Sequence, residues 1–123
     1  VTTNGITAKH IKGNSGALSI AASTGAGTSP SALSVSGTDM SGVVTLTTGT
    51  SPTINAILAT ITYNSAFSTA PVVALTPANA ATASLAAAQA VWVSISTGNF
   101  TINTNATAIN ASTIYKWNYV VIQ

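Results

Sequence analysis

The chain of 123 residues almost lacks charge, with no arginine, no glutamate and four fully charged side chains, Lys9, Lys12, Asp39 and Lys116. Soluble domains usually carry charge on about a quarter of their residues. Nucleic-acid binding needs several Lys or Arg contacts to phosphate, so three lysines exclude a nucleic-acid partner. No apolar run approaches the ~18 residues of a membrane span, and we expect no membrane insertion.

The residues that catalysis and metal binding require are also scarce. Cysteine is absent, which excludes disulfides and thiol nucleophiles. Asp39 is the only carboxylate and His10 the only histidine, and no G-x-S-x-G turn occurs. One histidine and one carboxylate also fall short of a metal-ligand set. We predict no enzyme, no cofactor and no metal site within one chain. Three copies of Asp39 or His10 could meet on a trimer axis, but for both an ordinary role as a solvated or hydrogen-bonded polar residue is favoured.

Uncharged polar residues take the place of the missing charge: 21 Thr, 15 Ser and 10 Asn, together with 22 Ala. Such a surface is hydrated by hydroxyls and amides. A net charge of +2 supplies little repulsion between copies, so association is expected. The chain begins with Val1 rather than methionine, which is typical of a processed product or of a piece of a longer chain.

The first 30 residues differ in pattern from the remainder. Residues 6–12 and 17–21 are predicted as short extended segments, and residues 13–16 between them have hairpin-turn chemistry. Residues 23–30 are rich in Gly, Ser, Thr and Pro, which indicates a linker. We therefore divide the chain into an extended N-terminal arm with its linker, residues 1–30, and a head domain, residues 31–123.

Short strands recur in the head at roughly ten-residue spacing, separated by Gly, Pro, Asn and Ser clusters. This spacing predicts an all-β antiparallel fold: a sandwich, jelly-roll-like, or a barrel. The predicted strands cover residues 32–36, 42–48, 56–63, 71–77, 91–96, 100–104 and 114–122. Residues 71–77 begin and end with proline, which favours an edge strand or a strand end. The alanine-rich residues 78–90 are predicted as a long loop, with a short helix as the alternative.

Alternation within these strands predicts which faces are buried. In residues 114–122 the aromatic face is expected in the core, because the other face carries Lys116 and Asn118. The side chains expected in that core face are Tyr115, Trp117, Tyr119 and Val121. Residues 56–63 place Ile57, Ala59, Ile61 and Tyr63 on one face and Leu58 on the other, outward face. Phe100 to Thr104 is expected to form a hairpin with residues 91–96.

The strongest candidates for binding lie in two places. Residues 91–96 direct Trp92, Ser94 and Ser96 outward, and the polar connection 103–112 contributes Asn103, Asn105 and Asn110. Sugars present both apolar CH faces and hydroxyls, so an exposed aromatic ring near amides and hydroxyls suits a glycan receptor. The alternative for Trp92 is packing in a subunit interface or under residues 78–90.

Two Thr-x-Thr motifs, at residues 45–47 and 60–62, raise a different alternative. Flat arrays of this kind are used by some ice-binding proteins. Those arrays repeat at a fixed period through the fold, and these two motifs do not, which disfavours ice binding.

Several stretches resemble a known family: residues 37–50 (GTDMSGVVTLTTGT), 70–80 (APVVALTPANA), 113–122 (TIYKWNYVVI) and the lead-in 6–14 (ITAKHIKGN). They are similar to the C-terminal head or tip of bacteriophage tail fibres and related surface-fibre proteins, including trimeric fibre adhesins of predatory bacteria. The resemblance implies an intertwined homotrimer, a shaft or neck from the N-terminal arm, and a head that binds cell-surface polysaccharide or another envelope receptor. It places the protein on a virion or on a bacterial surface.

The residues agree with a trimer. An arm with little apolar content cannot fold alone, whereas three copies can satisfy one another's backbone groups. The outward apolar residues Leu58, Val120 and Ile122 would then fill a subunit interface. Two alternatives stay open: a monomeric carbohydrate-binding module of a secreted enzyme, and a purely structural capsid or filament subunit without a receptor.

Overall fold

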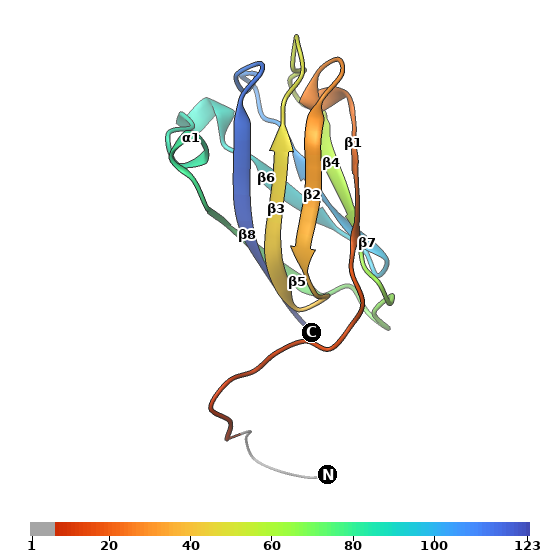
Figure 1. The fold of residues 1–123 in the computed structure, drawn as a ribbon. Helices are drawn as coiled ribbons and strands as arrows, with labels where there is room; N and C mark the ends of the chain where they lie inside the picture. Colours follow the sequence, from red (N-terminus) through yellow and green to blue (C-terminus); the bar gives the residue numbers. More distant parts are fainter. Residues whose placement is uncertain (1–6) are drawn as a thin grey trace.

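The computed structural model describes residues 7–123, which form two antiparallel four-stranded sheets packed face to face (Figure 1). The first sheet has the order β1 (Ser19–Ala22), β4 (Ile57–Thr62), β7 (Asn99–Asn103), β6 (Trp92–Ile95). The second has the order β2 (Ser31–Gly37), β3 (Ser41–Thr47), β8 (Ile114–Ile122), β5 (Val72–Pro77). The predicted all-β, sandwich-like class is therefore confirmed.

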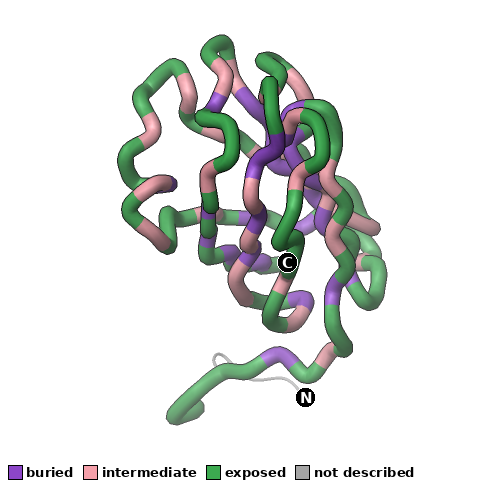
Figure 2. The backbone as a smooth tube through the Cα atoms, turned by 45° about the horizontal axis from the view of Figure 1, so that its top comes forward, coloured by how far each residue is buried: buried purple, intermediate pink, exposed green. Residues whose placement is uncertain are grey.

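The core lies between the sheets and is dominated by β8. Its residues alternate between exposed and buried along the whole strand, with Tyr115, Trp117 and Tyr119 inward. Tyr119 meets Phe100 of β7 across the sandwich at a centroid distance of 5.7 Å. The predicted aromatic core face is confirmed, and Figure 2 shows the same alternation of buried and exposed positions along the backbone. Burial of each large apolar side chain stabilises the fold by roughly 1.5–3 kcal/mol.

Strand β4 departs from the predicted alternation at its start. The pairing with β7 shifts register between Ile57 and Ala59, so the strand carries a bulge there. Leu58, expected to face outward toward a subunit interface, is fully buried, and Ile57, expected inward, is 39% exposed. The outward assignment of Leu58 was wrong because one extra residue reverses the sides that a strict two-residue period predicts.

The N-terminal region also differs from the expected hairpin and boundary. Within the described residues 7–12 there is no strand, and β1 pairs with β4 instead. Gly25 and Ala26, in the short 3-10 helix η1 (Thr24–Ala26), are buried against the sandwich. Residues 18–30 therefore pack as part of the sandwich, and the division at residue 30 does not coincide with its edge. Residues 23–30, whose composition indicates a linker, thus form a connection that is packed against the sheets through Gly25 and Ala26.

Three other features agree with the predictions made from the sequence. β5 is an edge strand, as its flanking prolines predict, and β6 and β7 form the expected hairpin. Residues 78–90 combine both alternatives, since a long connection contains the one-turn helix α1 (Ala80–Ala83) and the 3-10 helix η2 (Ala87–Gln89). Asn79 caps α1 by accepting from the Thr82 N–H at 3.0 Å. No helix in residues 7–123 is long and apolar enough to cross a membrane.

The sandwich has two ends of different character (Figure 1). The proximal end holds the β2–β3 turn, the C-terminus and the point where the N-terminal segment (residues 7–17) leaves the body. The distal end holds the β1–β2, β3–β4 and β7–β8 connections. These two names are kept below.

Candidate functional site

The outer face of the β1–β4–β7–β6 sheet, called here the hydroxyl face, carries most of the predicted binding residues. Residues directly opposite each other on antiparallel strands point to the same side of a sheet, so the registers define three cross-strand rows. The rows are Ser19, Thr62 and Asn99; Ala21, Thr60, Thr101 and Ser94; and Ile57, Asn103 and Trp92. Neighbouring strands lie about 4.8 Å apart and successive rows about 6.7 Å apart. The face is therefore a regular array of hydroxyl and amide groups.

Trp92 forms the aromatic border of this array. It lies on the edge strand β6, its side chain is 55% exposed, and it pairs with Asn103 across the hairpin. Asn103 is itself buried, with its Nδ2 donating to Thr101 Oγ1 at 3.0 Å and to the Trp92 carbonyl at 3.3 Å. Asn103 thus holds the strand beneath Trp92 in place, and its amide donor is already engaged. The indole and the Ser94 hydroxyl of the neighbouring row are exposed, and Thr60 and Thr101 in that row are half-buried.

The six predicted binding residues separate into three groups. Trp92, Ser94 and Asn103 come together on the hydroxyl face. Ser96 lies in the β6–β7 turn, where its hydroxyl donates to the Asn99 carbonyl at 3.1 Å and accepts from the Asn99 N–H at 3.2 Å. Asn105 and Asn110 lie in the β7–β8 connection at the distal end, away from the proximal turn that holds Ser96. No hydrogen bond in the described part of the chain joins either of them to Trp92.

The array contains residues that the sequence did not single out as binding candidates. Thr60, Thr62 and Thr101 contribute its central hydroxyls, and Ser19 extends it to the far edge. Alternation within each strand was the available signal, because it places Thr60 and Thr62 on one side of their strand. Which strands lie side by side is decided by pairing across about forty residues of sequence, and no local pattern predicts it.

The two Thr-x-Thr motifs do not join one surface. Thr60 and Thr62 lie on the hydroxyl face, whereas Thr45 and Thr47 pair with Lys116 and Ile114 on the outer face of the other sheet. A single flat threonine array that combines the two motifs is therefore absent from the described residues.

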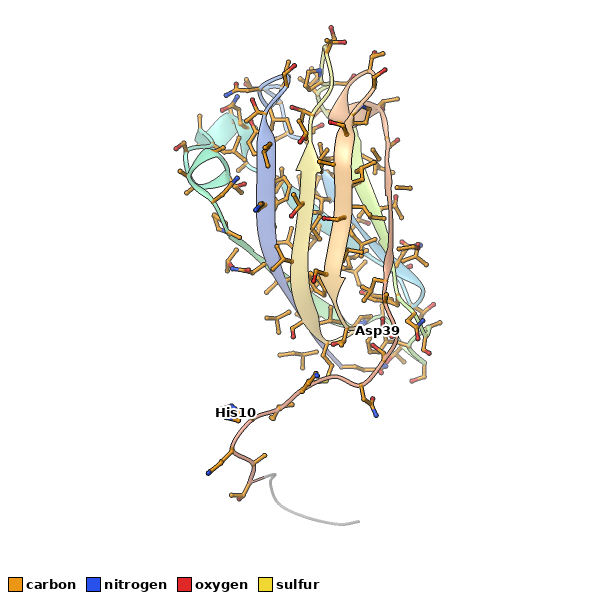
Figure 3. The ribbon with its side chains drawn as sticks, in the orientation of Figure 1. His10 and Asp39 are labelled. Carbon is orange, nitrogen blue, oxygen red and sulfur yellow. The ribbon has the colours of Figure 1, made fainter. Side chains whose placement is uncertain are left out.

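Charge lies away from the hydroxyl face. Lys116 projects from the outer face of the other sheet, and Lys9 and His10 lie on the N-terminal segment. Figure 3 shows His10 on that segment, well apart from Asp39 at the proximal end. Among residues 7–123 no group of three or more His, Asp or Glu could hold a metal ion. The face therefore presents neutral groups only.

Asp39 has the hydrogen-bonded structural role expected of it. Its two carboxylate oxygens accept from the N–H groups of Asn64 at 2.7 Å and Ser65 at 3.0 Å, which ties the β2–β3 turn to the β4–β5 connection. Tyr63 and Tyr119 lie nearby. Burial raises the pKa of each tyrosine to about 12, and the negative charge of Asp39 adds to the rise.

Comparison of the chain with protein-family models, with curated proteins and with solved structures found no match. The chemistry of the site is therefore argued from its own geometry. A neutral surface with regularly spaced hydroxyls and one exposed indole can stack on an apolar ring face and exchange hydrogen bonds with a polyhydroxyl ligand.

Proposed function

We propose that this chain is a non-enzymatic receptor-binding head, the tip of a trimeric phage tail fibre or bacterial surface fibre, which attaches to a glycan of the host or prey envelope. The observation that carries the proposal is the hydroxyl face with Trp92 at its border. The ligand is a neutral polysaccharide, because the face has no charged group to pair with an anionic sugar.

The binding mode follows from the layout of the face. A sugar ring stacks its CH face on the exposed Trp92 indole, while the next units of the chain lie along Ser94, Thr101 and Thr60. Hydrogen bonds between neutral groups that compete with water contribute little net free energy each, so one head binds weakly. Several heads on one fibre and several fibres on one particle raise the avidity.

Exposed apolar side chains support the trimeric part of the proposal. Val72, Val120 and Ile122 are 69%, 46% and 65% exposed. They share the outer face of the β2–β3–β8–β5 sheet, where the β5 and β8 registers place them together at the proximal end. Contiguous apolar surface of this kind suits contact with another chain. The fibre shaft would adjoin this end, which leaves the distal end free as the tip.

The test is a glycan array followed by titration calorimetry with a soluble oligosaccharide hit. We expect Trp92→Ala to weaken binding at least tenfold, because truncation of an exposed aromatic anchor removes its stacking contact. Met40→Ala is the matched control, since Met40 is 41% exposed at the proximal end, and its affinity should be unchanged. A soluble ligand is used so that avidity does not enter the comparison. Equal affinities for the Trp92→Ala variant and the unmodified chain would contradict the proposed face.

Light scattering on the full chain separates the alternatives. A mass of three chains together with glycan binding supports the fibre head. Glycan binding by a monomer favours a carbohydrate-binding module of a secreted enzyme. A stable assembly that binds no glycan favours a purely structural capsid or filament subunit.

A further inference from the structure

The distal end carries a cleft whose lining includes neither Trp92 nor any other residue predicted from the sequence to bind. Its volume is about 400 Å³, within the usual range for small-molecule sites. Seven of its eight lining residues carry a hydroxyl group, and the eighth is Gly49. The hydroxyl residues exposed at its surface are Thr28, Ser29, Ser31, Thr50 and Ser112. The cleft joins three connections that are far apart in the sequence (Figure 1).

Backbone hydrogen bonds fix the shape of the cleft. The Thr28 N–H donates to the Thr50 carbonyl at 2.7 Å, and the Thr50 N–H donates back to the Thr28 carbonyl at 3.0 Å. The Ser112 N–H donates to the Gly49 carbonyl at 3.1 Å, which ties in the β7–β8 connection. Because these bonds use main-chain groups, the side-chain hydroxyls of Thr28 and Thr50 are not needed to hold the cleft. They are available to a ligand.

Unusual backbone geometry is concentrated around this cleft. Ser29 and Ser112 line it with φ values of 55° and 49°, and Ala32 and Ser51 follow lining residues with φ values of 50° and 54°. Together with Asn55, these are all the non-glycine residues of positive φ in the part of the chain that the structure describes, and all five lie in or next to the distal connections. L residues rarely adopt this conformation, and its clustering is typical of functional sites.

We infer that the distal cleft is a second ligand site, which takes the neutral, hydroxyl-rich end of a glycan, such as one terminal sugar residue. Hydroxyl groups both donate and accept hydrogen bonds, which matches the hydroxyls of a sugar. The lining residues include no cation for a phosphate or carboxylate and no aromatic ring for stacking, so recognition depends on hydrogen bonds alone. The cleft lies at the end opposite the N-terminal segment, where a fibre tip would first meet a surface. The inference rests on the proposed function for the class of ligand and adds a site of different chemistry.

The test is amide NMR mapping on the unmodified full chain with a panel of neutral methyl glycosides at tens of millimolar, a range suited to weak sites. We expect shifts of the amide signals of residues 28, 29, 31, 48–51 and 112 for at least one sugar. The isosteric double variant Thr28→Val/Thr50→Val removes two exposed hydroxyls and keeps the backbone bridge, so it should weaken binding about tenfold. Thr97→Val is the matched control, because Thr97 is an exposed threonine in the proximal β6–β7 turn, outside both the hydroxyl face and the cleft. It should leave the cleft titration unchanged.

The outcomes separate the cleft from the proposed function. If the sugar shifts amide signals only on the hydroxyl face, and the Thr28→Val/Thr50→Val variant gives the same shifts, the cleft is not a ligand site. The proposal for Trp92 would then stand. Absence of cleft shifts with every sugar of the panel would also overturn it. Cleft shifts lost in the double variant, with no shift near Trp92, would support the cleft and contradict the hydroxyl face as receptor site. The mapping needs no variant, so a folding failure of the double variant cannot obscure the result.

Discussion

The two ends of the sandwich are held together in different ways. At the proximal end a buried carboxylate, Asp39, accepts two backbone N–H groups, and the Tyr119 hydroxyl donates to the Thr38 carbonyl at 2.8 Å. At the distal end no charged group of the described residues takes part: the buried Thr48 hydroxyl donates to the Asn110 carbonyl at 2.6 Å and the buried Thr104 hydroxyl donates to the Thr53 carbonyl at 2.7 Å, beside backbone hydrogen bonds, while the exposed hydroxyls of the cleft are left out of this anchoring. A side chain that is hydrogen-bonded within the fold is not free to contact a ligand, whereas an exposed hydroxyl that does not hold the fold together is. Substitutions should therefore act on stability at the proximal end, whereas exchange of exposed hydroxyls at the distal end should act on binding.

The largest expected effect comes from a distal glycine that breaks this rule. A Cβ at Gly49 would collide with the Thr28 carbonyl oxygen, a backbone atom that no side-chain rotation can move. Gly49→Ala should lower the free energy of unfolding by about 3 kcal/mol and disrupt the cleft. Gly98 lies in the proximal β6–β7 turn, and nothing lies within 4 Å of a Cβ placed there. Gly98→Ala is the matched control, with a change within about 0.5 kcal/mol in urea denaturation. Equal effects of the two substitutions would refute the close approach.

Next in size is the proximal carboxylate. In Asp39→Asn one of the two accepting oxygens becomes an N–H₂ group, which faces the N–H of Asn64 or Ser65. We expect a loss of about 2 kcal/mol, the scale of a hydrogen bond to a charged group together with an unsatisfied donor. Urea denaturation measures it. Ser94→Ala, on the exposed outer face of β6, is the control and should change stability by less than about 0.5 kcal/mol. An Asp39→Asn protein as stable as the Ser94→Ala variant would show that the proximal end does not depend on this carboxylate.

The dependence of stability on alkaline pH tests the proximal end through its two buried tyrosines, Tyr63 and Tyr119, without a substitution. Folding keeps Tyr63 and Tyr119 protonated until about pH 12, whereas in the unfolded chain they ionise near pH 10. Between these values the unfolded state binds fewer protons, so the free energy of unfolding falls as pH rises from 10 to 12. Below pH 9 these two tyrosines contribute no pH dependence. Urea titrations at successive pH values measure the slope, and the double variant Tyr63→Phe/Tyr119→Phe should flatten it. An unchanged slope in that variant would assign the alkaline loss to other groups.

Prediction from sequence succeeded where a pattern is local and failed where contact is distant. The two-residue period of β8 was enough to place Tyr115, Trp117 and Tyr119 in the core, because alternation in a strand fixes its buried side. The partner of β1 lies about forty residues away on β4, and nothing within residues 17–21 distinguishes that pairing from a hairpin with residues 6–12. The bulge between Ile57 and Ala59 likewise turned the Leu58 side chain to the side opposite the predicted one. A bulge has no distinct signature in composition or hydrophobicity, so a strict two-residue period could not predict it.

The candidate sites divide in the same way. Trp92 and Ser94 were accessible to prediction because β6 alternates cleanly between inward and outward side chains. The distal cleft could not be predicted in this way. The Gly, Ser, Thr and Pro of residues 23–30 are as compatible with a flexible linker as with an ordered segment of positive φ that lines a cleft. Only the bridge between Thr28 and Thr50 decides between them, and it joins segments more than twenty residues apart.

The smallest expected effect, and the sharpest, compares two tyrosines at the proximal end. Tyr119→Phe removes a hydroxyl that donates to the Thr38 carbonyl, and should lower the free energy of unfolding by about 1 kcal/mol. The Tyr63 hydroxyl is buried and has no hydrogen-bond partner among the described residues. Tyr63→Phe removes that unsatisfied group, so stability should be unchanged or rise by up to about 1 kcal/mol. The two variants delete the same atom from similar rings, and urea denaturation should give them opposite or clearly unequal signs. If both lost about 1 kcal/mol, Tyr63 would have a partner in solution, and anchoring at the proximal end would extend beyond Asp39 and Tyr119.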